Sequence, residues 1–220
     1  GVPTVDTIFD SAGQKGTGRW TVVAALELGV SVPTIAAAVD ARVLSSQYAT
    51  RQTLARPPES RNWENAANAL ADALLASRIC AYAQGLQLIA AGNTEYGWDI
   101  PLGLPPRVWT GGCIIRAKLL DEIIRALDTN PNEPNLLAHA DLGATIDACA
   151  SGLRETIATA AALAVPTPAL SASLAWIDMY RSARMPQNLT QAQRDAFGAH
   201  TYQRLDDPNG PAVHTDWFSS

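Results

Sequence analysis

Apolar residues recur at three- and four-residue steps through nearly all of this chain, and alternating β-branched runs of strand length are absent. Because one face of an α-helix repeats every 3.6 residues, this spacing predicts an all-α fold. A chain of 220 residues is long enough to bury a large core. We expect one multi-helix domain over residues 1–185, followed by a tail over residues 186–220.

Glycines and prolines set the expected helix boundaries. Gly29 ends the first helix, and Pro33 lies in the first turn of the second. Pro101, Pro105 and Pro106 predict a loop. The expected helices span residues 20–28, 33 to the Pro57-Pro58 pair, 62–92 with Asn62 as N-cap and Gly92 as the end, 113–127, 141–163, 171–184 and 191–197.

The helix expected over 62–92 has the pattern of a core helix. Its many alanines allow a close helix contact, either inside the domain or at a subunit interface. The tail has little apolar periodicity, and Pro208, Gly210 and Pro211 predict an extended segment that does not pack on itself. The core pattern of the long helix comprises Leu70, Leu74, Ile79, Tyr82, Leu86 and Ile89.

Composition limits the classes of function. The formal net charge of −5 argues against a general nucleic-acid binder. No run of about 20 apolar residues predicts a membrane span, and the N-terminus has no signal pattern, so we expect no membrane partner and a cytoplasmic protein. Cys80, Cys113 and Cys149 are widely spaced, which favours buried thiols over a disulfide or a zinc site.

The segment from Gly13 to Gly18 holds three glycines, Lys15 and Thr17. Glycines let backbone N–H groups approach an anion closely, and the lysine and the hydroxyl add donors. The spacing Gly-x-x-Gly-x-Gly matches neither the dinucleotide fingerprint nor the P-loop. On spacing alone, the segment is either an anion-binding loop or a flexible turn before a helix.

The stretch from Ile8 to Trp20, in which Asp10 and Trp20 frame the loop, resembles the signature of the 6-phosphogluconate dehydrogenases. Other segments resemble that family in the same order. They are Ala41-Arg42-x-Leu44-Ser45-Ser46, Glu95-Tyr96-Gly97-Trp98, Trp109-x-Gly111-Gly112-Cys113-Ile114-Ile115-Arg116, the closing stretch from Arg181 to Tyr202, and His214-Thr215-x-Trp217.

The resemblance implies the C-terminal helical part of an NADP-dependent enzyme of the pentose phosphate pathway and of gluconate utilization. Such an enzyme oxidatively decarboxylates 6-phosphogluconate to ribulose 5-phosphate and CO2. It also implies a homodimer in which the tail reaches into the partner subunit. The family's Rossmann domain and its catalytic lysine and glutamate precede the glycine loop. We therefore expect no catalytic residue in this chain, NADP bound mainly elsewhere, and no turnover by the chain alone.

Five positions carry the family's substrate contacts by resemblance. Lys15 and Thr17 contact the substrate, Arg42 binds its phosphate, and Arg194 and His200 reach the same site from the partner subunit. An arginine suits a phosphate because its planar fork binds two oxygens. Removing one such arginine is expected to weaken binding by about 10- to 100-fold.

Without the resemblance, each residue has a plainer interpretation. Arg42 fits a solvated helix surface, and His200 fits a structural or capping histidine. Arg194, beside Gln193 and Asp195, fits an ordinary polar helix face. The alternative function is a free-standing, non-catalytic helical module that dimerises or binds phosphorylated sugar acids. A related β-hydroxyacid dehydrogenase with another substrate is a weaker alternative, because the segment with Arg194 and His200 is specific to the sugar-phosphate enzymes.

Overall fold

The computed structural model describes residues 1–56, 63 and 66–218, and the chain divides into two compact units. We call Gly1–Ile177 the helical unit and Asp178–Ser220 the arm. The division falls inside helix α8 (Pro168–Arg181). The all-α prediction is confirmed: in the described ranges the regular elements are helices, and bridges occur only as isolated pairs in the arm.

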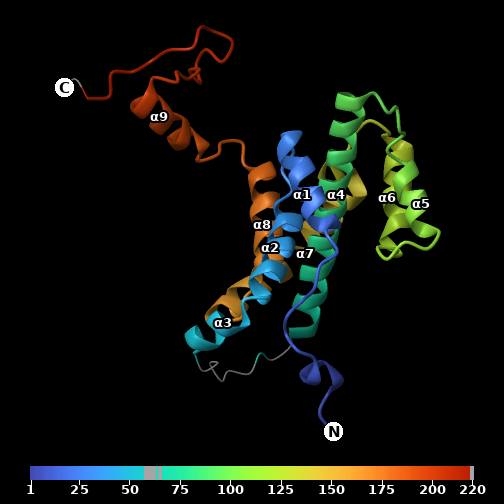
Figure 1. The fold of residues 1–220 in the computed structure, drawn as a ribbon. Coiled ribbons are helices and arrows are strands. Elements are labelled where there is room, and N and C mark those ends of the chain that lie inside the picture. The colour runs from blue at the N-terminus through green and yellow to red at the C-terminus, as the bar shows by residue number, and fades with distance from the viewer. Residues whose placement is uncertain (57–62, 64–65, 219–220) are drawn as a thin grey trace. The chain divides into compact units, whose positions relative to one another are not determined.

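The helical unit begins with a 3-10 turn, η1 (Thr4–Thr7), and three helices (Figure 1). They are α1 (Thr17–Glu27), α2 (Pro33–Ser45) and α3 (Tyr48–Leu54). The first helix starts three residues earlier than expected because Gly16 forms its N-cap. It is followed by Gly29 at φ +66°, and Pro33 opens α2, as predicted. The expected helix end at Pro57-Pro58 and the expected N-cap at Asn62 lie outside the described residues. The prediction of one helix from residue 33 up to that pair is wrong, because α2 ends at Ser45 and a separate helix, α3, follows.

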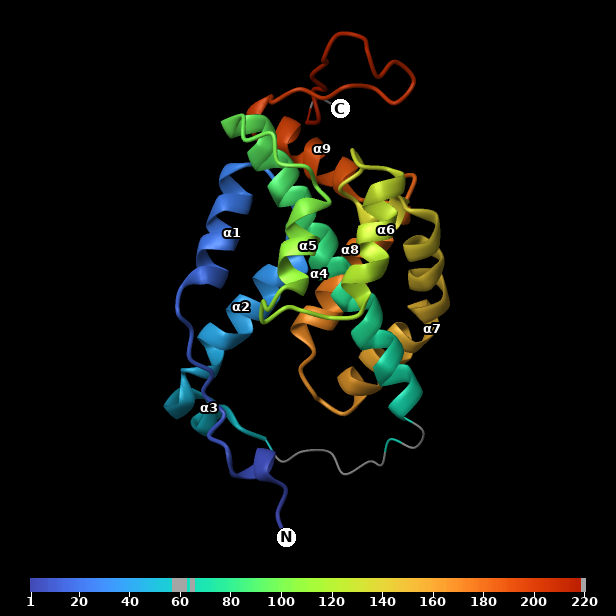
Figure 2. The same cartoon turned by 90° about the vertical axis from the view of Figure 1, so that its right-hand side faces the viewer.

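The centre of the unit is the pair α4 (Ala66–Tyr96) and α7 (Ala140–Ala162), which lie side by side in the ribbon views (Figure 2). A Cβ at Gly152 of α7 would lie 2.6 Å from the Cβ of Asp72. The two helices therefore approach as closely as the small residues of the sequence allow. Both helices supply buried side chains to one apolar core.

The expected apolar row of α4 is only partly buried. Ile79 and Leu86 lie in the core, and Tyr82 and Ile89 pack against it. The prediction is wrong for Leu70 and Leu74, which are exposed. Because α7 packs on the alanine face of α4, the large side chains at these two positions point elsewhere. By length and composition alone α4 would be able to cross a membrane, but its packing along α7 accounts for its apolar character as a core helix.

The end of α4 and the structure around Pro105 and Pro106 differ from the sequence expectation. Gly92 does not end α4, which continues to Tyr96. Instead, the ring of Trp98 packs where a side chain of residue 92 would stand, with Cζ3 2.7 Å from an ideal Cβ. The expected loop around Pro105 and Pro106 contains a short helix, α5 (Leu104–Thr110), because prolines fit the first turn of a helix.

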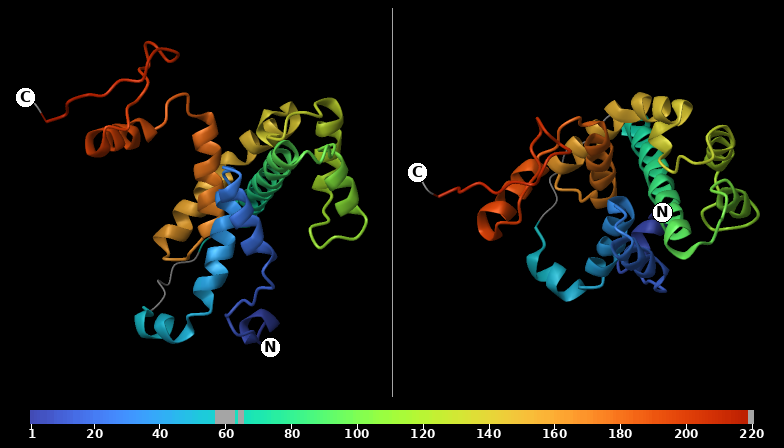
Figure 3. Two further views of the ribbon diagram at one scale, coloured as in Figure 1. Left: turned by 45° about the horizontal axis from the view of Figure 1, so that its top comes forward. Right: turned by 90° about the horizontal axis from the view of Figure 1, so that it is seen from above.

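The expected helix over 113–127 begins only at Leu119, as α6 (Leu119–Thr129). Gly112, at φ +136°, is part of the turn that delays it. Views from two further directions show α5 and α6 side by side (Figure 3). A 3-10 turn, η2 (Leu136–Ala138), leads to α7.

The cysteine prediction is confirmed for Cys80 and Cys149, which are buried and form no disulfide, and is wrong for Cys113, which is exposed in the turn before α6. Burial raises the pKa of the Cys149 thiol, and Asp72 raises it further. No group of three metal-ligating side chains occurs among residues 1–56, 63 and 66–218.

The arm contains the end of α8, helix α9 (Gln187–Gly198) and the tail. The tail does pack on itself, contrary to the sequence expectation. Tyr202 and Val213 exchange backbone hydrogen bonds at 2.9 Å in both directions, and the Tyr202 and Thr215 hydroxyls lie 2.6 Å apart. The segment between them therefore forms a closed loop without regular strands.

Candidate anion-binding site

The glycine loop ends in the N-terminus of α1. Gly16 has φ +100°, a conformation that side chains rarely adopt, and it caps the helix by accepting a hydrogen bond from Trp20 N. The first backbone N–H groups of any helix have no partner within the helix, and the helix dipole is positive there. Lys15 and Thr17 are exposed beside these donors. This end of α1 therefore suits a small anion.

Close packing between α1 and α2 brings Arg42 to the same loop. An ideal Cβ at Gly18 would lie 2.8 Å from Cγ2 of Val39, so a glycine permits this approach. Arg42, in the last turn of α2, donates from Nη2 to the carbonyl oxygen of Gly13 at 2.6 Å. The structure thus places Lys15, Thr17 and Arg42 around one loop, with the Arg42 guanidinium exposed beside it.

Further contacts hold the start of the loop. Ser45 Oγ accepts a hydrogen bond from Ala12 N at 2.9 Å and donates to the Arg42 carbonyl at 2.7 Å. Arg51 of α3 donates to both carboxylate oxygens of Asp10, at 2.8 and 2.9 Å, and to the Ser45 carbonyl at 3.1 Å. The Arg51 hydrogen bonds lower the pKa of the Asp10 carboxyl.

Arg51 was missed by sequence reasoning. It lies 41 residues from Asp10, and no spacing rule relates a loop carboxylate to an arginine on a later helix. Aromatic side chains surround this ion pair in the folded chain. Phe9 and Tyr48 have ring centroids 4.8 Å apart, and the Arg51 guanidinium lies 5.6 Å from the Tyr48 ring.

The arm is organised around Asp195, which is wholly buried. The plainer interpretation of Arg194 grouped Asp195 with an ordinary polar helix face, whereas the structure buries the Asp195 side chain. Oδ1 accepts from Thr201 N at 2.8 Å and from His214 Nδ1 at 3.0 Å. Oδ2 accepts from Thr215 N at 3.0 Å and from Trp217 Nε1 at 2.8 Å. One carboxylate therefore ties four residues of the tail to α9.

This environment keeps the carboxylate charged. Burial by itself raises the pKa of Asp195, because it disfavours the charged form. The hydrogen bonds from Thr215, His214, Trp217 and Thr201 outweigh burial, and the pKa lies well below the ordinary aspartate range. His214 has a structural contact here, and so does His139, whose Nε2 lies 2.9 Å from the Glu133 carbonyl oxygen.

His200 lies on a strained turn at the end of α9. Ala199 and Thr201, on either side of it, have φ values of +48° and +60°. Residues with a Cβ adopt this conformation at a cost of about 1–3 kcal/mol each, so other contacts must hold them. The backbone N–H groups of both residues donate to Asp195, from Ala199 to its carbonyl and from Thr201 to its side chain, each at 2.8 Å.

Arg194 and His200 line one open depression of about 410 Å3 at the end of α9. Both side chains are exposed, and the depression is also lined by Gln193. The structure therefore places Arg194 and His200 on one common surface within the arm.

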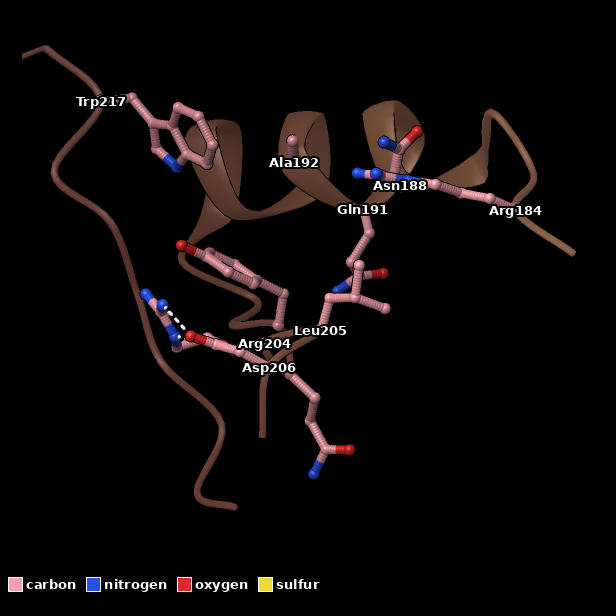
Figure 4. Close-up of a pocket in the computed structure, with 10 residues that line it drawn as sticks. Arg184, Asn188, Gln191, Ala192, Arg204, Leu205, Asp206 and Trp217 are labelled. Atoms are coloured by element: carbon pink, nitrogen blue, oxygen red, sulfur yellow. Dashed lines mark hydrogen bonds and ion pairs between the residues drawn. The ribbon is translucent and has the colours of Figure 1, made fainter. Parts of the chain in front are cut away.

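A larger hollow of about 650 Å3 lies on another side of α9 (Figure 4). The figure shows an ion pair, Arg204 to Asp206, in its wall. Helix α9 and the tail face each other across it. The labelled lining residues are Arg184, Asn188, Gln191, Ala192, Arg204, Leu205, Asp206 and Trp217.

These features define a helical domain with two exposed cationic surfaces, one around the glycine loop and one in the arm. Residues 1–217 match the family described as 6-phosphogluconate dehydrogenase, C-terminal domain. The chain therefore belongs to the 6-phosphogluconate dehydrogenase family.

Full-length relatives agree with this assignment. The chain is 49% identical over 225 residues to a decarboxylating 6-phosphogluconate dehydrogenase of Synechococcus elongatus, with 99% of this chain and 47% of that enzyme covered. It is 43% identical over 225 residues to the NADP(+)-dependent decarboxylating enzyme of Bacillus subtilis, with 99% and 48% covered. The chain spans about half the length of these relatives.

A solved structure has the same fold. The 6-phosphogluconate dehydrogenase of Plasmodium falciparum superimposes with a TM-score of 0.88 and 38% sequence identity, covering 97% of this chain and 47% of that one. Its description covers the apo form and complexes with its cofactor NADP+ and its substrate 6-phosphogluconate.

Proposed function

We propose that this chain supplies the substrate-binding and dimer-forming part of an NADP-dependent 6-phosphogluconate dehydrogenase acting in the cytoplasm. The observation that carries the proposal is the family match over residues 1–217. The reaction is the oxidative decarboxylation of 6-phosphogluconate to ribulose 5-phosphate and CO2.

The phosphate end of the substrate has a dianionic group that needs several donors. In our proposal, the free N–H groups at the start of α1, the Thr17 hydroxyl and the Lys15 ammonium surround it, and the Arg42 guanidinium binds it. Arg42 donates from Nη2 to Gly13, which leaves its other nitrogens available for a ligand. Preorganisation of the arginine by the loop reduces the entropy lost on binding.

Arg194 and His200 of the arm are proposed to complete the site of a second subunit. Arg194 supplies a permanent charge, and His200 supplies a donor that can be neutral or charged near neutral pH. Exchange of arms between two copies would make each substrate site depend on both copies. Dimerisation would then be required for tight binding.

The described residues do not fit the cofactor. A dinucleotide site of the Rossmann type needs a parallel sheet with a crevice at the carboxyl ends of its strands, whereas residues 1–56, 63 and 66–218 form helices and isolated bridges. We therefore assign no NADP contact and no catalytic proton transfer to this chain. We expect NADP to bind mainly through the part of the parent enzyme that this chain does not include.

Calorimetric titration of the chain with 6-phosphogluconate tests the proposal, with gluconate and inorganic phosphate as comparison ligands. We expect selective binding of the phosphorylated acid, weakened about 10- to 100-fold by Arg42→Ala or Arg194→Ala. Arg125→Ala in α6 and Arg204→Ala in the tail are matched controls that keep the wild-type affinity.

Two results would contradict the proposal. Equal affinity for 6-phosphogluconate and gluconate would remove the phosphate-binding role. NADPH formation by the purified chain would show that catalytic groups are present here. Selective binding with a stable monomer at all concentrations would favour the alternative of a non-catalytic sugar-acid-binding module.

A further inference from the structure

The side chain of Gln191 contacts both Arg194 and the turn that carries His200, and these two residues form the cationic surface in the arm. It lies in the first half of α9, three residues before Arg194, and its side chain extends from the helix beside the tail (Figure 4). Its amide oxygen accepts from Arg194 Nη1 at 3.1 Å, and its amide nitrogen donates to the Thr201 carbonyl at 2.6 Å. One amide group therefore joins the arginine to the turn that bears His200.

The turn from Ala199 to Thr201 depends on such contacts. Two of its N–H groups donate to Asp195, as described above, and its Thr201 carbonyl accepts from Gln191. Because Ala199 and Thr201 both have positive φ values, the turn relaxes toward other conformations if a contact is lost. Gln191 supplies the contact that also reaches Arg194.

We propose that Gln191 is a positioning residue, which holds Arg194 and His200 in the correct relative position before any ligand binds. This inference rests on the proposed function, because it assumes that Arg194 and His200 bind the phosphorylated substrate. Gln191 itself is half-buried and lines the larger hollow rather than the depression that holds those two residues. Its effect on a ligand is therefore indirect.

The arrangement also explains why an amide is needed at this position. Arg194 requires an acceptor and the Thr201 carbonyl requires a donor, and glutamine supplies one of each. A glutamate would keep the acceptor for Arg194 but present a second acceptor to the carbonyl. A leucine of similar size would provide neither group.

The test uses the full chain and its three histidines, which give a simple set of imidazole signals in NMR spectra. Gln191→Leu is expected to shift the His200 ring signal, speed hydrogen exchange of the Thr201 amide, and weaken 6-phosphogluconate binding by about 10-fold. Gln187→Leu replaces an exposed glutamine at the start of the same helix. We expect this control to leave the His200 signal, the Thr201 amide exchange and the 6-phosphogluconate affinity unchanged.

Gln191→Glu separates positioning from a general loss of structure. We expect the Arg194 side-chain signal to stay near its wild-type position, because the carboxylate still accepts its hydrogen bond. The His200 signal moves as in Gln191→Leu. Movement of neither signal in Gln191→Glu, or equal behaviour of Gln191→Leu and Gln187→Leu, would overturn the proposal.

The two proposals fail in different ways. If the wild-type chain binds 6-phosphogluconate no better than gluconate, the proposed function fails. The His200 signal and the Thr201 amide exchange need no ligand, so they still decide whether Gln191 positions the turn. If binding is selective but unaffected by Gln191→Leu, only the positioning role is wrong.

Discussion

The glycine loop of the helical unit and the His200 turn of the arm both present predicted substrate contacts, but they are held in opposite ways. The loop is fixed by several exposed contacts from two helices. Arg42 and Ser45 of α2 and Arg51 of α3 each form a hydrogen bond to a different residue of the loop or of the segment before it. The turn is fixed mainly by one buried carboxylate, Asp195. The loop therefore has several partly independent anchors, whereas the arm depends on a single group.

The difference has a physical cause. Exposed ion pairs gain little, because water competes for both charges and salt screens them. The buried Asp195 carboxylate accepts four hydrogen bonds at once, so removing it releases four residues of the tail together. A chain segment with little apolar surface, such as this tail, can therefore be ordered by one polar centre.

The largest effect is expected from Asp195→Asn. The amide would turn an N–H group toward donors that now point at a carboxylate oxygen, and the tail would separate from α9. We expect 6-phosphogluconate affinity to fall by about 100-fold, since the positions of both Arg194 and His200 are lost. Asp206→Asn is the matched control, because its carboxylate is exposed and pairs with Arg204. Similar affinity for the two variants would contradict this role.

Acid is expected to release the tail from α9, as Asp195→Asn does, because protonation of Asp195 removes the charge of the carboxylate. Asp195 has a lowered pKa in the folded chain, so its stabilisation is complete above the ordinary aspartate pKa of about 3.9. It decreases as the pH falls below that value, where the unfolded chain binds the proton first, and is lost as the pH falls through the folded pKa. The amide shifts of Thr201 and Thr215 are followed from about pH 5 down to about pH 1.5, because the folded carboxylate takes up its proton only well below the ordinary aspartate range. Asp195→Asn should show no such dependence.

A smaller effect is expected at the glycine loop. Arg51→Ala removes the anchor of Asp10 but leaves those from Arg42 and Ser45, so we expect affinity to fall by about 10-fold. Arg107→Ala removes a similar two-pronged pair, to Asp128, between α5 and α6, and should not change affinity. Calorimetry with 6-phosphogluconate measures the affinity of both variants. If Arg51→Ala and Arg107→Ala bind it with the same affinity, Arg51 does not position the loop.

Changes in the helix core should alter stability and leave affinity unchanged. Gly152→Ala places a methyl group against Asp72 and is expected to lower the free energy of unfolding by about 1–3 kcal/mol. Gly85→Ala lies inside α4 with open space around it, and alanine favours a helix more than glycine does. This variant should raise the free energy of unfolding by about 0.5–1 kcal/mol. Thermal unfolding measures the stability of both variants, and calorimetry measures their affinity for 6-phosphogluconate. A loss of affinity in Gly152→Ala would show that the core and the loop are coupled.

Local sequence signals predicted the helices well where one residue controls the backbone. Gly29 and Pro33 set the end of α1 and the start of α2 because their conformations depend on no distant partner. Gly92 misled because its reason for being glycine is the ring of Trp98, which packs against it. Leu70 and Leu74 misled because periodicity marks an apolar face without showing which face a neighbour covers.

By itself, the sequence determined the helical class, several helix boundaries and the family, and it predicted five contact residues. These depend on local backbone preferences or on the order of motifs along the chain. Tertiary structure decided that Arg51 holds Asp10, that Asp195 is buried and that Gln191 joins Arg194 to Thr201. Such pairings depend on which surfaces meet after folding, because the hydrogen-bond partner of a polar side chain is fixed by geometry and not by its neighbours in sequence.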